Sequence, residues 1–128
     1  METAVVIDAC VFIEHFRSKN KEGSLLTKLN RQWGKLYVSA VANYEVFIGA
    51  HERDMNEWRK IFENVTVLAF DDATVATACD IYRQLKQENK LVGLGDILIA
   101  ATAIANDLPL ATFNRNHFER IRDLQMIG

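Results

Sequence analysis

Short runs of aliphatic and β-branched residues alternate along the chain with stretches in which apolar residues recur every three or four positions. The runs predict strands, and the stretches between them predict helices. Strands that alternate with helices favour a parallel sheet with helices on both faces. We therefore expect an α/β fold with a five-stranded parallel sheet, whose strands lie near residues 3–7, 35–39, 65–68, 108–113 and 124–127.

Helical spacing is clear after most of these strands. It predicts helices near residues 11–17, 24–32, 71–89 and 97–106, and a turn or short helix at 115–121. Between residues 40 and 62 a charged cluster interrupts the apolar face, so this segment forms either one bent helix or two helices. The glycines at 93 and 95 are expected to break the chain just before Asp96.

Composition places the chain among ordinary globular proteins. Its 128 residues suffice for one domain, residues 1–128, and 49% hydrophobic with 25% charged residues excludes disordered, collagen-like and disulfide-scaffold proteins. The longest apolar stretch, residues 97–105, is about half the length that spans a bilayer, so we expect no membrane association and a cytoplasmic protein. Cys10 and Cys79 are expected to be buried thiols in a reducing compartment. A net charge of −2 leaves any nucleic-acid binding to local basic groups.

Four polar residues stand where a ligand crevice is expected. Asp8 ends the first buried run, and the carboxyl ends of parallel strands line the crevice of an open α/β sheet. Glu45 has apolar neighbours one helical turn away on either side. Asp96 begins a helix, and Asn114 directly follows the fourth strand, which is expected to lie beside the first at the switch point of the sheet.

Three carboxylates and an amide in one crevice would repel one another unless a cation lay between them. Oxygen ligands select Mg²⁺ or Mn²⁺ over zinc, and the sequence has no clustered Cys and His residues. A divalent cation with bound waters suits hydrolysis of phosphodiester bonds. The sequence therefore indicates a magnesium or manganese site made by Asp8, Glu45 and Asp96, with Asn114 beside it.

The order and spacing of these blocks resemble PIN-domain ribonucleases, and most of all the VapC toxins of bacterial toxin–antitoxin pairs. The blocks begin at Ile7, Ser39, Gly95 and Thr112, and 37 and 51 residues separate the successive acids. The resemblance covers essentially the whole chain. It implies a metal-dependent endoribonuclease with RNA as substrate, a homodimer, and a small VapB-like antitoxin partner.

The same resemblance assigns roles by position. Asp8, Glu45 and Asp96 match the acidic metal-binding triad, and Asn114 matches the polar residue after the fourth strand. Cys10 departs from the family pattern, because a serine or threonine is common at that position.

His117 also departs from the pattern, since many members have a fourth aspartate there. A neutral imidazole supplies no negative charge, which favours one metal over two. Candidate RNA contacts lie in two basic segments, 17–21 and 115–122, and the residues chosen from them are Arg17, Lys19, Arg115 and His117.

Two other classes of function remain open at this point. A receiver-like phosphorylation module is also a small α/β domain with Mg²⁺ at an acidic pocket, but it needs an acidic pair after the first strand and a phosphoacceptor aspartate after the third. Here Asp8 is followed by Ala9, and Asp71 and Asp72 after the third strand read as a helix cap. An inactive PIN-like interaction protein is the second alternative, and the intact acidic triad argues against it.

Overall fold

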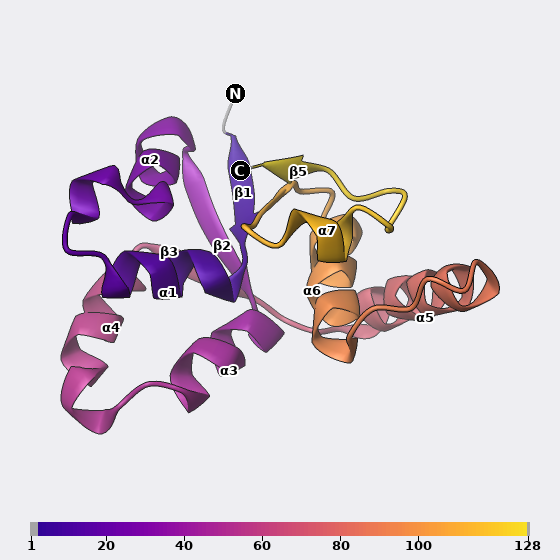
Figure 1. Ribbon diagram of the computed structural model, residues 1–128, viewed down its shortest axis with the longest axis horizontal. Helices are drawn as coiled ribbons and strands as arrows, with labels where there is room; N and C mark the ends of the chain where they lie inside the picture. Colours follow the sequence, from indigo (N-terminus) through magenta and orange to yellow (C-terminus); the bar gives the residue numbers. More distant parts are fainter. Residues whose placement is uncertain (1–2, 128) are drawn as a thin grey trace.

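The computed structural model describes residues 3–127 and shows one five-stranded sheet (Figure 1). The strand order is β3-β2-β1-β4-β5, and every neighbouring pair is parallel. The predicted α/β fold with a five-stranded parallel sheet is thus confirmed. The strands are β1 (Ala4–Ile7), β2 (Lys35–Ser39), β3 (Val65–Leu68), β4 (Leu110–Ala111) and β5 (Met126–Ile127).

Helices cover the sheet on both sides, with α1 and α2 on one side and α5 and α6 on the other (Figure 1). The ambiguous segment between residues 40 and 62 forms two helices, joined by a short 3₁₀ turn, η2. No helix in the described part of the chain is long and apolar enough to cross a membrane. The helices and 3₁₀ turns are α1 (Ala9–Arg17), η1 (Lys21–Gly23), α2 (Leu25–Gln32), α3 (Ala40–Ile48), η2 (Glu52–Asp54), α4 (Met55–Ile61), α5 (Asp72–Gln87), α6 (Leu94–Ala105) and α7 (Arg115–Phe118).

The boundaries of α6, β4 and β5 are among those that differ from the sequence prediction. Helix α6 begins at Leu94, so Gly95 lies inside its first turn and Gly93 is the residue before the helix. The first N–H groups of a helix have no partner within it, and a glycine there interrupts little. Strands β4 and β5 have only two residues each, since Pro109 cannot donate to the sheet and the chain turns into α7 after Asn114.

Strand β1 lies at the centre of the sheet and at the switch point of its topology. Val5, Val6 and Ile7 are fully buried there. The strand pairs with β2 on one side and with β4 on the other. From β1 the chain adds β2 and β3 on the first side of the sheet and then crosses to add β4 and β5 on the second side. The carboxyl ends of β1 and β4 therefore form the crevice in which α/β proteins bind ligands.

A cluster of aromatic side chains fixes helix α3 against helices α1 and α4. Phe16 stacks on Trp58 with ring centres 4.4 Å apart, and Phe12 stacks on Phe62 at the same separation. Phe47 of α3 packs edge-on against Trp58 and tilted against Phe62. Burying rings of this size contributes strongly to stability. The cluster therefore holds the helix that carries Glu45 in a defined place.

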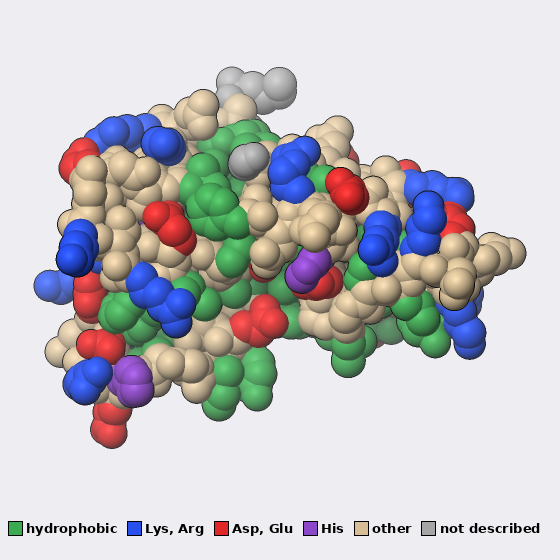
Figure 2. Space-filling view, in the orientation of Figure 1, with side chains coloured by type: hydrophobic (Ala, Val, Ile, Leu, Met, Phe, Trp, Pro, Cys, Tyr) green, Lys and Arg blue, Asp and Glu red, His purple; other side chains and the backbone are tan. Residues whose placement is uncertain are grey.

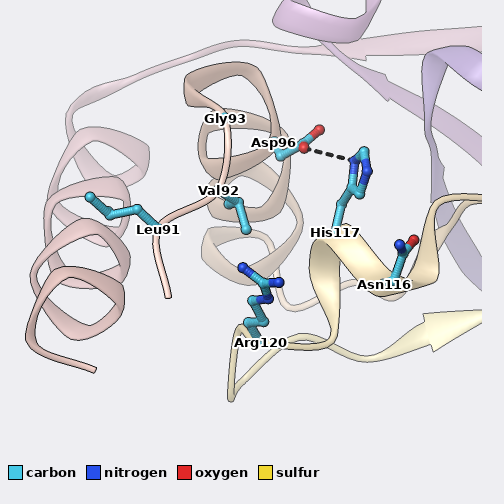
Figure 3. Close-up of a pocket in the computed structure, with 7 residues that line it drawn as sticks. All are labelled: Leu91, Val92, Gly93, Asp96, Asn116, His117 and Arg120. Carbon is cyan, nitrogen blue, oxygen red and sulfur yellow. Dashed lines mark ion pairs between the residues drawn. The ribbon is translucent and has the colours of Figure 1, made fainter. Parts of the chain in front are cut away.

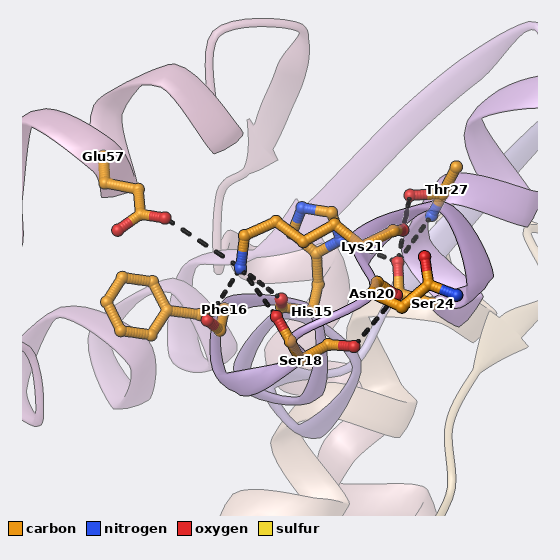
Figure 4. Close-up of polar contacts among 8 residues, drawn as sticks. All are labelled: His15, Phe16, Ser18, Asn20, Lys21, Ser24, Thr27 and Glu57. Carbon is orange, nitrogen blue, oxygen red and sulfur yellow. Dashed lines mark hydrogen bonds and ion pairs between the residues drawn. The ribbon is translucent and has the colours of Figure 1, made fainter.

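Lys21 closes the carboxyl end of helix α1 (Figure 4). Its ammonium group donates hydrogen bonds to the backbone carbonyls of His15, Phe16 and Ser18, at 3.0, 2.9 and 3.2 Å. A cation at this end of a helix donates to carbonyls that have no helical partner and interacts favourably with the negative end of the helix dipole. Lys21, one of the two lysines in the basic segment 17–21, thus has a structural role.

The expectation of two buried thiols was wrong. Cys79 of α5 is exposed, and Cys10 is only partly buried. The helical spacing around Cys79 was correct, but its position falls at the edge of the apolar stripe instead of inside it. Apolar neighbours in the sequence do not ensure burial on a helix whose outer face is solvated.

Candidate active site

Asp8 is buried at the carboxyl end of β1, with a side chain only 4% exposed. Its Oδ1 accepts a hydrogen bond from the backbone N–H of Ala9 at 2.8 Å, so the carboxylate caps helix α1. Backbone N–H groups at a helix amino end stabilise negative charge. The strand ends and the helix begins at this residue, and that junction holds the carboxylate in the crevice.

Thr112 is the closest partner of Asp8 from the neighbouring strand, and the sequence analysis did not single it out. Its hydroxyl donates to Asp8 Oδ2 at 2.8 Å and accepts the backbone N–H of Asn114 at 2.9 Å, and the residue is fully buried. The register of β1 against β4 brings the two residues together across 104 positions of sequence. Its place near the end of the predicted strand 108–113 was the only available signal.

Cys10 shares this polar contact, at the position where the family resemblance led us to expect a serine or threonine. Its Sγ donates to Asp8 Oδ2 at 3.4 Å, lies 3.6 Å from Thr112 Oγ1, and accepts the backbone N–H of Phe113 at 3.5 Å. Burial, and then the nearby charge of Asp8, raise the pKa of the thiol. The sulfur therefore remains protonated, and the hydroxyl contact to Asp8 comes from Thr112 instead.

Glu45 projects from α3 towards the same crevice. Its pKa is raised first by burial and then by the charges of Asp8 and Asp96, which shows that the three carboxylates lie within range of one another. Gly95 lies beside this carboxylate: a Cβ at that position would be 3.4 Å from Glu45 Oε2, so the amino end of α6 is in contact range of the Glu45 side chain from α3.

Asp96 lies in the first turn of α6 and pairs with a residue of α7. Its Oδ2 is 3.2 Å from His117 Nδ1. Burial raises the pKa of Asp96, the neighbouring His117 lowers it, and the charge of Asp8 raises it again. Asp96 is the third residue of α6 and not its cap. A negative charge is still favoured at this position by the helix dipole.

Asn114 precedes helix α7 and is tied to the site through its backbone. Its N–H donates to Thr112 Oγ1, whose own proton goes to Asp8. Among residues 3–127 the side-chain amide of Asn114 makes no hydrogen bond that caps α7 or joins another residue. The contact of Asn114 with the site that the structure shows is thus the one made by its backbone.

The structure separates the four candidate RNA contacts. His117 touches Asp96, and Arg17 lines a hollow that also contains Glu45. Lys19 and Arg115 are exposed, and neither lines that hollow or the one beside Asp96. Figure 2 shows acidic side chains and a histidine close together in the middle of one face, with basic side chains further out.

The donor atoms fit a divalent cation of the magnesium type. All are oxygens, and the raised pKa values of Glu45 and Asp96 show negative charge that only His117 offsets. Within the described residues 3–127, no three His, Cys, Asp or Glu side chains form a cage that would hold a metal by themselves. Mg²⁺ is usually bound through one or two carboxylates and retains several waters, so a complete protein cage is not required.

These features define the class of protein: a doubly wound α/β domain with an acidic site at the switch point of its sheet. The sequence matches the family described as PIN domain over residues 5–124. The chain belongs to the PIN-domain family.

Comparison with individual proteins places it among the VapC ribonucleases. It is 32% identical to Ribonuclease VapC1 of Rickettsia felis, over 96% of this chain and 94% of that protein. Its fold matches the DNA-bound VapBC structure of Salmonella typhimurium with a TM-score of 0.87, at 21% identity and covering 98% and 97% of the two chains. It also matches a toxin–antitoxin complex of Klebsiella pneumoniae with a TM-score of 0.75, at 21% identity over 97% and 96%.

Proposed function

We propose that this single domain, residues 1–128, is a metal-dependent endoribonuclease and the toxin of a VapBC-type toxin–antitoxin pair. The observation that carries the proposal is the convergence of Asp8, Glu45 and Asp96, from three separate elements, at the switch point of the sheet. These three residues would hold Mg²⁺ or Mn²⁺, and RNA would be the substrate. Because cellular RNA is the substrate, the protein would act in the cytoplasm.

A bound divalent cation would supply a water of lowered pKa and would offset the negative charge of the phosphate. The protein side chains position the metal ligands and transfer the proton. Thr112 and the amino end of α1 hold the Asp8 carboxylate in place through hydrogen bonds, and His117 orients Asp96. Glu45, the least enclosed of the three acids, has a raised pKa and can accept the proton of the attacking water at its carboxylate. The amide of Asn114 can orient waters at the edge of the site.

The topology argues against the receiver-like alternative. In receiver domains the strand order is 2-1-3-4-5, so the third strand lies beside the first. Here β3 is an edge strand separated from β1 by β2. Asp71, which follows β3, accepts hydrogen bonds from Thr74 as a helix cap and does not lie with Asp8. An inactive interaction protein, the other alternative, would have no need of three acids that repel one another.

Removal of divalent metal tests the proposal directly. Purified protein should cleave cellular RNA with Mg²⁺ or Mn²⁺, lose cleavage in EDTA, and recover it when either ion is added back. Gel analysis and sequencing of the new 5′ ends measure this. Cleavage that is unaffected by EDTA would contradict the metal dependence, and absence of cleavage with both ions would contradict the nuclease activity. Phosphorylation of an aspartate by acetyl phosphate would instead support a receiver.

Two protein partners complete the proposal. A VapB-like antitoxin is supported by the toxin–antitoxin complexes that share this fold. We propose that it occupies the hollow between α1, α3 and α4, about 260 Å³ in volume, because this hollow contains both Glu45 and Arg17 and a segment seated there would cover the acidic site.

The second partner is another copy of the chain. Large apolar side chains are exposed on α3, α5 and α6; they are Tyr44, Ile48, Val75, Tyr82 and Leu94. Figure 2 shows hydrophobic side chains along the lower edge of the molecule. A hollow of about 440 Å³ between α5 and α6 is lined almost entirely by apolar residues. An exposed patch of this kind is typical of a protein–protein interface.

Charge placed in this patch should separate the copies. We expect the protein to sediment as a dimer and Tyr82→Glu to sediment as a monomer, because a buried unpaired carboxylate is costly at an apolar interface. Lys28→Glu, on the exposed face of α2, serves as the control and should remain dimeric. Sedimentation velocity measures both. A monomeric unsubstituted protein, or a dimeric Tyr82→Glu variant, would contradict this interface.

A further inference from the structure

A second hollow lies on the α7 side of Asp96, away from the groove that contains Arg17. It has a volume of about 330 Å³, and Figure 3 shows the side chains around it. Its walls come from the segment before α6, from α6 itself and from α7 with the turn after it. The lining residues are Leu91, Val92, Gly93, Asp96, Asn116, His117 and Arg120.

Arg120 has no acidic partner among residues 3–127. Within residues 3–127 no carboxylate lies within ion-pair distance of its guanidinium, whereas Arg122, two residues later, pairs with Glu88. Figure 3 shows the guanidinium of Arg120 directed towards Val92, and the imidazole of His117 directed towards Asp96. A positive group thus lies in a hollow whose other end is the carboxylate of Asp96.

The remaining lining suits a nucleotide. A guanidinium can bind a phosphate through two parallel hydrogen bonds. The amide of Asn116 offers both donors and an acceptor to a ribose hydroxyl or a base edge. Val92 provides an apolar surface against which a ribose or base can pack.

We propose that this hollow binds the nucleotide next to the cleaved bond, with its phosphate on Arg120. The inference rests on the proposed function, because Asp96 marks the position of the scissile phosphate. It gives the RNA a path on the protein surface. The RNA passes from the acidic crevice along α7, and Arg120 binds a phosphate that is not itself cleaved. Arg120 is therefore a substrate-binding residue outside the acidic triad.

The test compares Arg120→Gln with Arg59→Gln, an exposed arginine on α4 that changes the net charge equally. Binding of a fluorescein-labelled single-stranded RNA of mixed sequence is measured with Mg²⁺ at several salt concentrations, in an Asp8→Asn background that prevents cleavage. Arg120→Gln should weaken binding about tenfold, as expected for one charge-assisted contact, and should lower the salt slope by about one. Arg59→Gln should change neither quantity, and Arg120→Lys should recover part of the loss.

Cleavage kinetics with Asp8 intact give a second measurement. Arg120→Gln should raise KM with kcat unchanged, which is the signature of a contact equally strong in the ground state and the transition state. If Arg120→Gln behaves as Arg59→Gln while the unsubstituted protein cleaves RNA, the subsite is wrong and the nuclease proposal stands. A fall in kcat without a change in KM also overturns the subsite. If the unsubstituted protein neither binds nor cleaves RNA with Mg²⁺, both proposals are wrong.

Discussion

Asp8→Asn is expected to lower the rate of RNA cleavage about a thousandfold, which corresponds to about 4 kcal/mol of transition-state stabilisation. The substitution removes the one carboxylate that is both buried and hydrogen-bonded at two oxygens, at the centre of the acidic site. An asparagine carbonyl can still accept the N–H of Ala9, so helix α1 should keep its cap. Single-turnover cleavage at saturating Mg²⁺ measures the rate.

The control for this variant is Asp123→Asn, which changes an exposed aspartate near the carboxyl end of the chain. It should cleave as the unsubstituted protein does. Asp8 raises the pKa of both Glu45 and Asp96, so removing its charge relieves repulsion. The metal-free Asp8→Asn variant should therefore melt no lower than the unsubstituted protein. A folded variant that retains a tenth or more of the cleavage rate would show that Asp8 is not a metal ligand.

Thr112→Val is expected to have the second-largest effect, on both activity and stability. Valine fills the same volume but cannot donate to Asp8 Oδ2 or accept the N–H of Asn114. A buried group left without its partner costs about 1–3 kcal/mol. Removing a residue that orients a metal ligand typically lowers metal affinity or activity about 10- to 100-fold. Urea denaturation and the Mg²⁺ dependence of cleavage measure the two effects.

Thr112→Ser is the matched control, because it keeps the hydroxyl and loses only a methyl group. It should keep most of the activity, although the small cavity left in the buried site will lower stability slightly. The comparison separates hydrogen bonding from packing. Equal loss in Thr112→Val and Thr112→Ser would assign Thr112 a packing role and would contradict its action through Asp8.

The sequence led to the acids more reliably than to their surroundings. Asp8 ends an apolar run and Glu45 has apolar helical neighbours, so each carries a local sign of an unusual environment. Asp96 was found with the wrong local structure: it lies within the first turn of α6 and not at its start. Gly95 was read as a break, but it lies inside the first turn of α6, where the N–H groups have no helical partner and a glycine interrupts little.

Basic residues were the least predictable part of the site. Arg17, Lys19 and Arg115 were chosen because of charge and position along the chain, yet only Arg17 lies in a hollow with one of the acids. His117 was found to contact Asp96 directly. The direction of an exposed side chain depends on the neighbours it meets in space, which local sequence does not contain.

The sequence by itself determined the alternation of strands and helices and the parallel sheet, and it singled out three acids as candidates, because hydrophobic periodicity and isolated charges beside apolar runs are local properties. The tertiary structure decided which groups meet. Pairing of β1 with β4 brings Thr112 to Asp8 across 104 residues, packing of α3 against α6 brings Glu45 to Gly95, and the placement of α7 brings His117 to Asp96 and directs Arg120 into a hollow. Contacts of this kind depend on strand register and helix packing, which only the assembled fold specifies.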